Sequence, residues 1–183
     1  MEQRSIAVLF SGNGTNFRYL LENLDKRYKI VVALTNNPDA KGIDIAHEFG
    51  IECIVINSKE YKEREDFDRE VVSALSSYDL DLVVLAGFMR ILTPIFIESF
   101  KAINLHPSLL PRHKGLRAIE RSYEDEYADG GVSVHFVSSE LDGGEIILQK
   151  SISKENLSFD EYNRVIRDIE KEALLEAIYR VLE

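Results

Sequence analysis

Short apolar runs alternate with segments of helical periodicity along the first two thirds of this chain, and this alternation limits the fold more than any other feature. Apolar runs of this length predict buried strands, and they occur at residues 6–10, 30–34, 52–56, 81–86 and 102–105. Helical spacing lies between them, in a segment that begins near residue 17 and in the segments 40–49, 60–78 and 93–100. Strands that alternate with helices predict a parallel sheet covered by helices on both faces.

The last part of the chain departs from this alternation. Residues 116–127 have helical spacing, residues 131–137 alternate apolar and polar side chains, and residues 146–152 form another apolar run. The alternating segment is typical of a half-buried strand, and the two strands predict an antiparallel hairpin. Ser158 and Glu161 predict a capping box at the start of a C-terminal helix. We therefore expect one α/β domain over residues 1–183: a doubly wound, mostly parallel, Rossmann-like sheet with a mixed edge and a C-terminal helix.

The charge balance and the cysteine count argue against several classes of function. Asp and Glu outnumber Lys and Arg by 32 to 22, a net charge of −10 in 183 residues. This balance argues against nonspecific binding to nucleic acid or to an anionic membrane. The single cysteine, Cys53, cannot form an internal disulfide, which fits a reducing cytoplasm. We see no signal peptide, no membrane-spanning run and no metal-binding histidine motif, so we expect a cytoplasmic protein without a bound metal.

A glycine-containing turn, Ser11–Asn16, follows the first expected strand and precedes the first helix. Glycines let backbone N–H groups approach an anion closely, and the start of a helix favours negative charge, so the turn predicts a phosphate site. It lacks the third glycine of the dinucleotide fingerprint, whose place falls at Phe17, and it has no Walker A lysine. We expect a monophosphate rather than NAD or ATP. The alternative is that the glycines serve only the geometry of the turn.

Asn104 and His106 end the apolar run at 102–105 and are two positions apart, so on a strand they project from the same face. Two donors aimed at one point could stabilise an oxyanion, and the histidine could also move a proton. Taken alone, the pair could equally mark a strand that leaves the sheet through a polar turn.

Three other places carry candidate side chains. Residues 87–92 follow the strand at 81–86 and could line a pocket for a flat aromatic ligand, since α/β sheets bind ligands at strand C-termini; ordinary packing is the alternative. The double glycine after Asp142 could present that carboxylate inward or merely make a turn. Arg64 could reach a ligand or belong to a solvated helix face. His135 is interpreted as a hydrogen-bonded strand histidine rather than as a catalyst.

Four of these stretches together resemble the phosphoribosylglycinamide formyltransferase family, the folate-dependent enzymes of purine synthesis. They are Ser11–Asn16, Ala86–Leu92, Asn104–Pro111 and Val134–Gly144. The resemblance implies a formyltransferase-type fold and transfer of a formyl group from 10-formyltetrahydrofolate to the amine of glycinamide ribonucleotide. It places the catalytic residues at Asn104, His106 and Asp142. The first two, with His106 cationic, would donate to the oxyanion, and Asp142 would mediate proton transfer.

The resemblance also assigns the binding residues. Gly14, Thr15 and Asn16 would hold the substrate phosphate, Gly87 would lie beside the glycinamide arm, and Glu172 would bind the ribose hydroxyls. The residues implied around the folate are Arg64, near the glutamate tail, and Met89, Arg90, Ile91, Leu92, Glu140 and Leu141, near the pterin. We expect these two small molecules as the partners, with no nucleic acid and no membrane, and either a monomer or a homodimer.

Further details follow from the resemblance. It favours a cis peptide bond between Leu110 and Pro111. Two departures are visible: Ala173 stands where the family has a histidine beside its ribose-binding glutamate, and no histidine lies soon after Gly115 and Leu116.

Related and unrelated functions compete with this interpretation. Formyltetrahydrofolate deformylase and methionyl-tRNA formyltransferase resemble the same core, but each carries an additional domain that we do not find here. An acidic domain is also a poor tRNA binder. A noncatalytic nucleotide-binding module is the alternative from a different class, and it gives no reason for Asn104, His106 and Asp142 to occur together.

Overall fold

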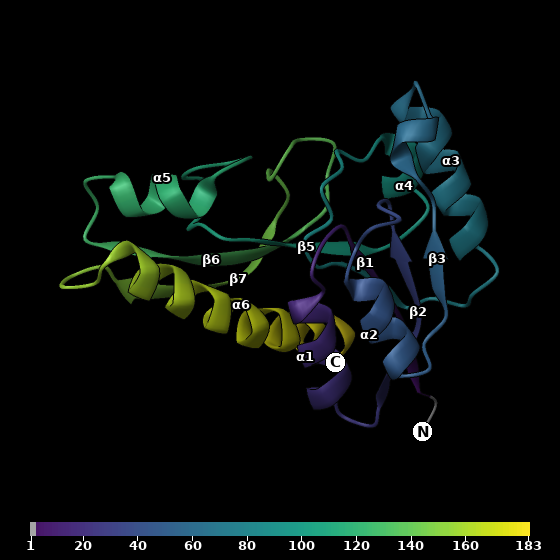
Figure 1. Cartoon of the computed structure of the whole chain (residues 1–183), viewed down its shortest axis with the longest axis horizontal. Helices are drawn as coiled ribbons and strands as arrows, with labels where there is room; N and C mark the ends of the chain where they lie inside the picture. The colour runs from purple at the N-terminus through teal and green to yellow at the C-terminus, as the bar shows by residue number, and fades with distance from the viewer. Residues whose placement is uncertain (1–2) are drawn as a thin grey trace. The chain divides into compact units, whose positions relative to one another are not determined.

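The computed structural model describes residues 3–183 (Figure 1). Its strands form one seven-stranded sheet with the order β3-β2-β1-β4-β5-β6-β7. The elements are β1 (Arg4–Phe10), α1 (Thr15–Asn23), β2 (Tyr28–Thr35), α2 (Gly42–Glu48), β3 (Cys53–Val55), a 3₁₀ turn (Ser58–Glu60), α3 (Arg64–Leu75), β4 (Leu82–Leu85), α4 (Pro94–Ile97), β5 (Ala102–His106), α5 (Ala118–Glu124), β6 (Asp129–Phe136), β7 (Ile146–Ser153) and α6 (Phe159–Leu182). The pairings β1–β2, β1–β4 and β2–β3 are parallel, whereas β6 and β7 are antiparallel. The expected mostly parallel sheet with a mixed edge and a C-terminal helix is therefore confirmed.

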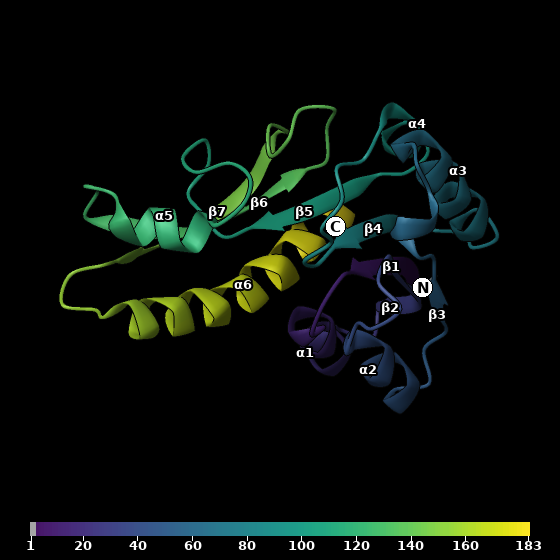
Figure 2. The ribbon, with the colours of Figure 1, turned by 45° about the horizontal axis from the view of Figure 1, so that its top comes forward.

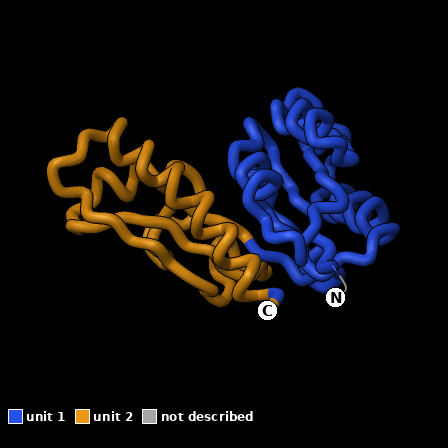
Figure 3. Tube along the Cα trace, turned by 90° about the horizontal axis from the view of Figure 1, so that it is seen from below, with its two compact units in different colours: residues 1–103, 182 blue, residues 104–181, 183 orange. Residues whose placement is uncertain are grey.

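The chain divides into two compact units, which Figure 3 shows in different colours. Unit 1 comprises the described residues up to 103 together with residue 182, and unit 2 comprises residues 104–181 and 183. Residues 1 and 2 of the expected single domain lie outside the described part of the chain. The expectation of one domain over 1–183 stays a prediction.

Unit 1 is built around β1, whose last five residues are buried. Phe10 of β1 stacks on Phe17 of α1 with ring centroids 5.3 Å apart. Gly42, the first residue of α2, lies so close to the Phe10 ring that an added Cβ would be 2.3 Å from it. In Figure 2, α1 and α2 lie together on one face of these strands, and α3 and α4 lie on the other. The apolar runs of the sequence thus form a strand layer between two helix layers.

Helix α3 is shorter than the sequence pattern predicted. Helical spacing suggested residues 60–78, but α3 spans Arg64–Leu75 and follows a separate 3₁₀ turn. Tyr61 and Glu63 have extended backbone conformations, which end the 3₁₀ turn and begin the helix afresh. Asp68, on the buried face, accepts hydrogen bonds from the N–H and the hydroxyl of Thr93 at 2.6 and 2.7 Å. This carboxylate fixes α3 to the residue that precedes α4.

Unit 2 is built around the hairpin of β6 and β7, and α6 runs along it in both ribbon views (Figures 1 and 2). The prediction that this first hairpin strand is half-buried was wrong, because six consecutive residues of β6 are buried on both faces. Tyr162 of α6 covers one face and touches Gly130, at which an added Cβ would lie 2.0 Å from the Tyr162 hydroxyl oxygen. Ser158 and Glu161 form the capping box predicted for the start of α6.

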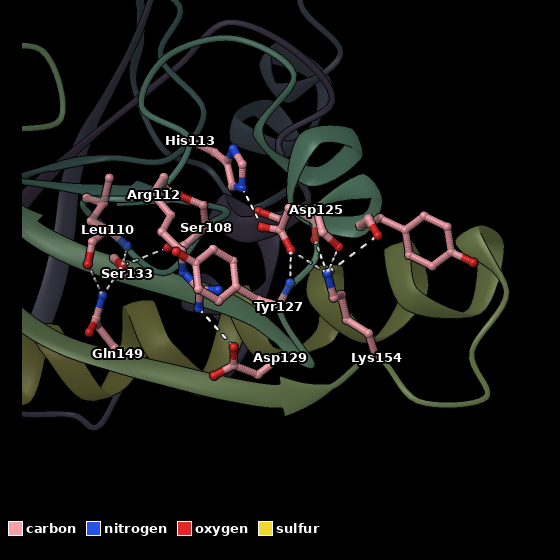
Figure 4. Close-up of polar contacts among 12 residues, drawn as sticks. Ser108, Leu110, Arg112, His113, Asp125, Tyr127, Asp129, Ser133, Gln149 and Lys154 are labelled. Atoms are coloured by element: carbon pink, nitrogen blue, oxygen red, sulfur yellow. Dashed lines mark hydrogen bonds and ion pairs between the residues drawn. The ribbon is translucent and has the colours of Figure 1, made fainter.

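Side-chain hydrogen bonds fix the turn that follows β5 to this hairpin (Figure 4). The buried Ser133 hydroxyl of β6 donates to the Ser108 carbonyl at 2.7 Å and accepts from the Leu110 N–H at 2.9 Å. Gln149 of β7 donates to the same hydroxyl at 2.8 Å and to the Leu110 carbonyl at 2.9 Å. The peptide bond between Leu110 and Pro111 is cis, as expected.

No helix within residues 3–183 is both long and apolar enough to cross a bilayer.

Replacing Gly130 with alanine should destabilise the fold, because the new methyl group would overlap the buried Tyr162 ring. Overpacking of this kind costs about 1–3 kcal/mol of unfolding free energy. Urea denaturation measures it, and the Gly12→Ala variant is the control, because an added Cβ there meets nothing within 4 Å. Equal stability of the two variants would contradict the predicted close packing of β6 against α6.

Candidate active site

Asp142 is the centre of a polar cluster in unit 2. It lies in the loop between β6 and β7, has a left-handed backbone conformation with φ of 48°, and is only 9% exposed. One carboxylate oxygen, Oδ1, lies 3.3 Å from Nδ2 of Asn104. The other, Oδ2, accepts the Gly115 N–H at 2.8 Å and faces Nδ1 of His106 at 3.4 Å. The structure therefore brings together Asn104, His106 and Asp142.

Strand β5 provides the spacing that this cluster requires. Asn104 and His106 are its third and fifth residues, so their side chains leave the same face of the strand. His106 is 5% exposed, and Asn104 is half-buried. Both side chains reach one carboxylate, but they contact different oxygens.

His106 is held in one tautomer by its backbone partner. Its Nε2 lies 2.8 Å from the carbonyl oxygen of His113. A carbonyl can only accept a hydrogen bond, so Nε2 carries the hydrogen, and Nδ1 is the nitrogen that faces Asp142. Burial lowers the pKa of His106 below its usual value, and the His113 carbonyl and the Asp142 carboxylate oppose this effect without overcoming it. The sequence argument had weighed only the carboxylate, which favours the cationic form.

Asp142 itself is favoured as a carboxylate. Burial alone would raise its pKa. The imidazole of His135, the N–H of Gly115 and the imidazole of His106 outweigh burial and hold the pKa of Asp142 below its usual value. The cluster thus combines an ionised carboxylate with a histidine whose neutral form is favoured. The neutral imidazole can accept a proton, and the carboxylate beside it can stabilise the imidazolium that results.

His135 is the hydrogen-bonded strand histidine that the sequence predicted, but its place in this cluster was not foreseen. Its Nδ1 lies 2.8 Å from the Phe136 carbonyl, which can only accept, so Nδ1 carries a hydrogen. Nε2 lies 3.2 Å from Nδ2 of Asn104 and 3.6 Å from Oδ1 of Asp142. The alternation of residues 131–137 placed this ring on a face of the strand, but only the fold shows that the face is buried against Asn104.

In unit 1, the turn of residues 11–16 is tied to the loop after β4. The Ser11 hydroxyl accepts the Met89 N–H at 2.7 Å and donates to the side-chain oxygen of Asn36 at 2.5 Å, and the Ser11 N–H donates to the Gly87 carbonyl at 2.9 Å. These bonds bring together two of the stretches that the sequence singled out.

The same turn has the geometry of an anion site. Gly14 precedes α1 in a left-handed conformation with φ of 70°, and an added Cβ would lie 2.8 Å from the backbone of Gly42. Thr15 is exposed at the first position of the helix. The side-chain oxygen of Asn16 is buried and has no hydrogen-bond partner among the described residues. A turn that exposes a helix start in this way suits a phosphate group.

The residues assigned to the folate differ in their surroundings. Met89, Ile91 and Leu141 are apolar side chains that are 70%, 47% and 48% exposed, whereas Leu92 is buried. Exposed apolar side chains of this size are candidates for contact with a ligand. The Arg90 guanidinium lies over the Phe67 ring, 4.7 Å from its centroid.

The remaining candidate residues lie on the surface of their units. Glu140 pairs with Lys114 at 2.6 Å, and Glu172 of α6 is exposed and lies 3.8 Å from Lys150. Arg64 is exposed at the first position of α3. The described residues hold no group of three or more His, Cys, Asp or Glu side chains suited to a metal ion.

The chain is similar to known proteins over most of its length. The family model described as formyl transferase matches residues 4–178. Phosphoribosylglycinamide formyltransferase of Escherichia coli is 40% identical over 154 residues, which are 81% of this chain and 72% of that protein. The crystal structure of phosphoribosylglycinamide formyltransferase from Campylobacter jejuni matches with a TM-score of 0.95 and 46% identity, over 99% of this chain and 98% of that one.

Glycinamide ribonucleotide transformylase 1 from Symbiobacterium toebii matches with a TM-score of 0.90 and 32% identity, over 96% of this chain and 86% of that one. The match of the family model spans nearly the whole chain, and the relative from Escherichia coli exceeds 30% identity over most of its own length. The chain therefore belongs to the formyl transferase family, in its phosphoribosylglycinamide formyltransferase branch.

Proposed function

We propose that Asn104, His106 and Asp142 catalyse the transfer of a formyl group from 10-formyltetrahydrofolate to the primary amine of glycinamide ribonucleotide in purine biosynthesis. The observation that carries this proposal is the convergence of the Asn104 amide and the His106 imidazole on the ionised, buried carboxylate of Asp142, at 3.3 and 3.4 Å. A noncatalytic nucleotide-binding module has no need of such a cluster, because burying a carboxylate is costly unless it is well partnered.

The reaction requires two charge changes that the cluster can serve. The amine nitrogen attacks the formyl carbon and forms a C–N bond, which turns the formyl oxygen into an oxyanion. The bond from that carbon to the folate nitrogen then breaks, the attacking amine loses a proton and the folate nitrogen gains one. The enzyme must therefore supply donors to the oxyanion and a path for the proton.

Asn104 is suited to the first task because its present bonds are long. Its two amide hydrogens face Asp142 and His135 at 3.3 and 3.2 Å, beyond the 2.9–3.0 Å most common for N–H···O bonds. An oxyanion forms shorter and stronger charge-assisted bonds and can displace one of these partners. The donor is therefore drawn to charge that exists only after the attack, which favours the transition state over the bound substrate.

His106 and Asp142 are suited to the second task. Nδ1 of His106 is the free nitrogen of the neutral ring and faces Asp142. It can take the proton of the attacking amine, directly or through water. The resulting imidazolium is stabilised by the carboxylate and donates to the oxyanion until the folate nitrogen receives the proton.

Binding of the two substrates is assigned to the remaining residues. The turn at Gly14, Thr15 and Asn16 would hold the phosphate of glycinamide ribonucleotide, and the exposed Met89 and Ile91 would contact the flat pterin. The polar surroundings of Gly87 would receive the glycinamide arm. Because the family model spans residues from both units, we propose that both serve one reaction within one domain.

We assign the remaining candidates on the same basis. Arg64 would meet the folate glutamate tail, and Glu172 would meet the ribose hydroxyls. Arg90, Leu92, Glu140 and Leu141 would complete the surroundings of the pterin. We place the protein in the cytoplasm, as a monomer or a homodimer.

An assay of the purified protein tests the proposed function. The chain should formylate glycinamide ribonucleotide when 10-formyltetrahydrofolate is present. Release of formate without any formylated nucleotide would instead identify a hydrolase, and the absence of both products would refute catalysis.

The Asp142→Asn variant should fold but turn over slowly. Asparagine tolerates the left-handed backbone conformation of residue 142 and can still accept hydrogen bonds, but it cannot stabilise an imidazolium or take a proton. Loss of a positioned acid–base group lowers kcat by about a hundredfold to ten-thousandfold. Steady-state kinetics and a thermal melt separate the two roles: near-normal turnover removes Asp142 from the mechanism, and an unfolded variant assigns it to the structure.

The losses caused by Asn104→Ala and His106→Ala should not multiply. Removing one oxyanion donor costs about a hundredfold to a thousandfold in kcat. If both side chains serve the same transition state, the double variant should be little slower than the slower single variant. Single-turnover rates with both substrates saturating measure this. Independent, multiplicative losses would mean that the two residues act in separate steps.

The Thr15→Asp variant should bind glycinamide ribonucleotide more weakly. The new carboxylate would repel the phosphate at the start of α1, so KM for this substrate should rise while KM for the folate stays the same. Thr15→Asn is the matched control, because asparagine has nearly the same size as aspartate but carries no charge. An unchanged KM for the nucleotide in the aspartate variant would place the phosphate elsewhere.

A further inference from the structure

A chain of hydrogen bonds joins Lys154, Asp125 and His113 within unit 2 (Figure 4). It begins at Lys154, whose side chain is 9% exposed. The ammonium group donates to Asp125 Oδ1 at 2.6 Å, to the Ser122 carbonyl at 2.7 Å and to the Asp125 carbonyl at 3.1 Å. The Tyr123 carbonyl lies farther away, at 3.5 Å, so the three nearest acceptors match the three hydrogens of the ammonium group. The carbonyls lie at the C-terminal end of α5, where a cation is favourable.

Asp125 connects this lysine to His113. Its Oδ2 lies 2.5 Å from Nε2 of His113, and its Oδ1 accepts from Lys154 and from the N–H of Tyr127. Burial would raise the pKa of Asp125, but the hydrogen bonds from Lys154 and His113 outweigh it and hold the pKa below its usual value. An ionised carboxylate only accepts hydrogen bonds, so Nε2 of His113 is the donor.

His113 has a backbone conformation that needs such an anchor. Its φ is 55°, in the left-handed region that residues with a Cβ rarely occupy unless their surroundings hold them there. The preceding carbonyl, of Arg112, accepts the Ser108 hydroxyl at 2.6 Å. In this conformation the His113 carbonyl faces Nε2 of His106 at 2.8 Å.

The segment 113–115 therefore touches both members of the candidate catalytic pair. The His113 carbonyl receives the Nε2 hydrogen of His106, and two residues later the Gly115 N–H donates to Oδ2 of Asp142. The first contact sets the tautomer and the orientation of the imidazole, and the second orients the carboxylate that faces it. A shift of this segment would change the 3.4 Å separation between His106 Nδ1 and Asp142.

We propose that His113, Asp125 and Lys154 are positioning residues for His106: the ion pair of Lys154 and Asp125 anchors the His113 side chain, and this anchor holds the carbonyl that fixes the Nε2–H tautomer of the catalytic imidazole. The proposal rests on the catalytic role assigned to His106 above. It extends that role to three side chains whose described hydrogen bonds are with one another and with α5 and the loop that follows it, not with Asn104 or Asp142.

The test has one readout that does not depend on activity. Nitrogen-15 NMR of the imidazole rings reports which nitrogen of His106 carries the hydrogen and the pH at which the ring titrates. In the unaltered chain, His106 should be the Nε2–H tautomer. In the His113→Phe variant, which keeps a ring but loses the bond to Asp125, it should become a mixture of tautomers. Because the His113 carbonyl raises the pKa of His106, the variant should also titrate at lower pH. Asp142, His135 and Arg121 also act on this titration, and the variant leaves them unchanged.

Kinetics supply the second readout. His113→Phe should lower kcat by about tenfold to a hundredfold, by analogy with the loss found when outer-shell partners of metal-ligating histidines are removed, with KM for both substrates little changed. His113→Gln should restore most of kcat, because its amide can still donate to Asp125. Lys154→Met should resemble His113→Phe. If that variant does not fold, the double variant Asp125→Asn/Lys154→Met, which leaves no unpaired charge, replaces it.

Asp129→Asn is the matched control. It breaks the ion pair of Arg112 with Asp129, which is 3.1 Å long and lies beside the same turn, but it leaves His113 and its anchor intact. This control should keep the tautomer of His106 and kcat. An unchanged His106 tautomer in a folded His113→Phe protein would overturn the proposal, and so would an equal change in Asp129→Asn. A wrong catalytic assignment would give a different result: His106→Ala would then retain full turnover, even if His113→Phe changed the tautomer of His106 in the otherwise unaltered chain.

Discussion

The burial of the Asp142 carboxylate is the constraint on which the arrangement of unit 2 depends. A buried carboxylate without partners would be far less favourable than a hydrated one. Asp142 therefore needs polar partners from several directions, and the fold supplies them from the end of β5, from β6 and from the segment after the cis peptide. Each of these segments is fixed in turn by contacts of its own, so the demands of one charged group extend through most of the unit.

The same requirement applies to the other buried polar residues of unit 2, among them Ser108, Ser133 and His135. Buried polar groups are stable only when their hydrogen bonds are complete, and a partly satisfied network is less favourable than an apolar core. In unit 2, Ser133 bonds to the turn after β5, His135 to the carbonyl of Phe136, and Lys154 to Asp125. These hydrogen bonds offset part of the free-energy cost of burying polar groups in this unit.

Much of the fold could be predicted from the sequence, and the failures have physical causes. Apolar runs marked the strands of the parallel part because those strands are buried on both faces. The alternation of β6 was misleading, since its polar face is buried too, against partners that hydrogen bond with Ser133 and His135. Helix α3 was predicted too long because helical spacing continues through residues whose backbone is extended. Periodicity records which side chains are apolar, but not where a buried polar group finds its partner.

The candidate site, too, could be predicted from the sequence only in part. The spacing of Asn104 and His106 was sufficient to place both side chains on one face of a strand. The approach of Asp142 depends on a loop conformation that no local pattern specifies, and it came from family resemblance. The place of His135 in the cluster depends on which face of β6 is buried, and the anchor at His113 could not be found from the sequence because it acts through a backbone carbonyl. Any residue type can supply a carbonyl, so its role leaves no mark on the amino-acid pattern.

The hydroxyl of Ser133 has a consequence for the dynamics of the turn after β5. One donated and two accepted hydrogen bonds exhaust the capacity of a hydroxyl group, and this residue is fully buried. The Leu110 amide hydrogen therefore points at a saturated, water-free acceptor although it lies outside every strand and helix. Its exchange with solvent deuterium requires the hairpin itself to open, so a loop amide should exchange as slowly as the core of a sheet. On the time scale of hydrogen exchange, this turn behaves as part of the hairpin rather than as a loop.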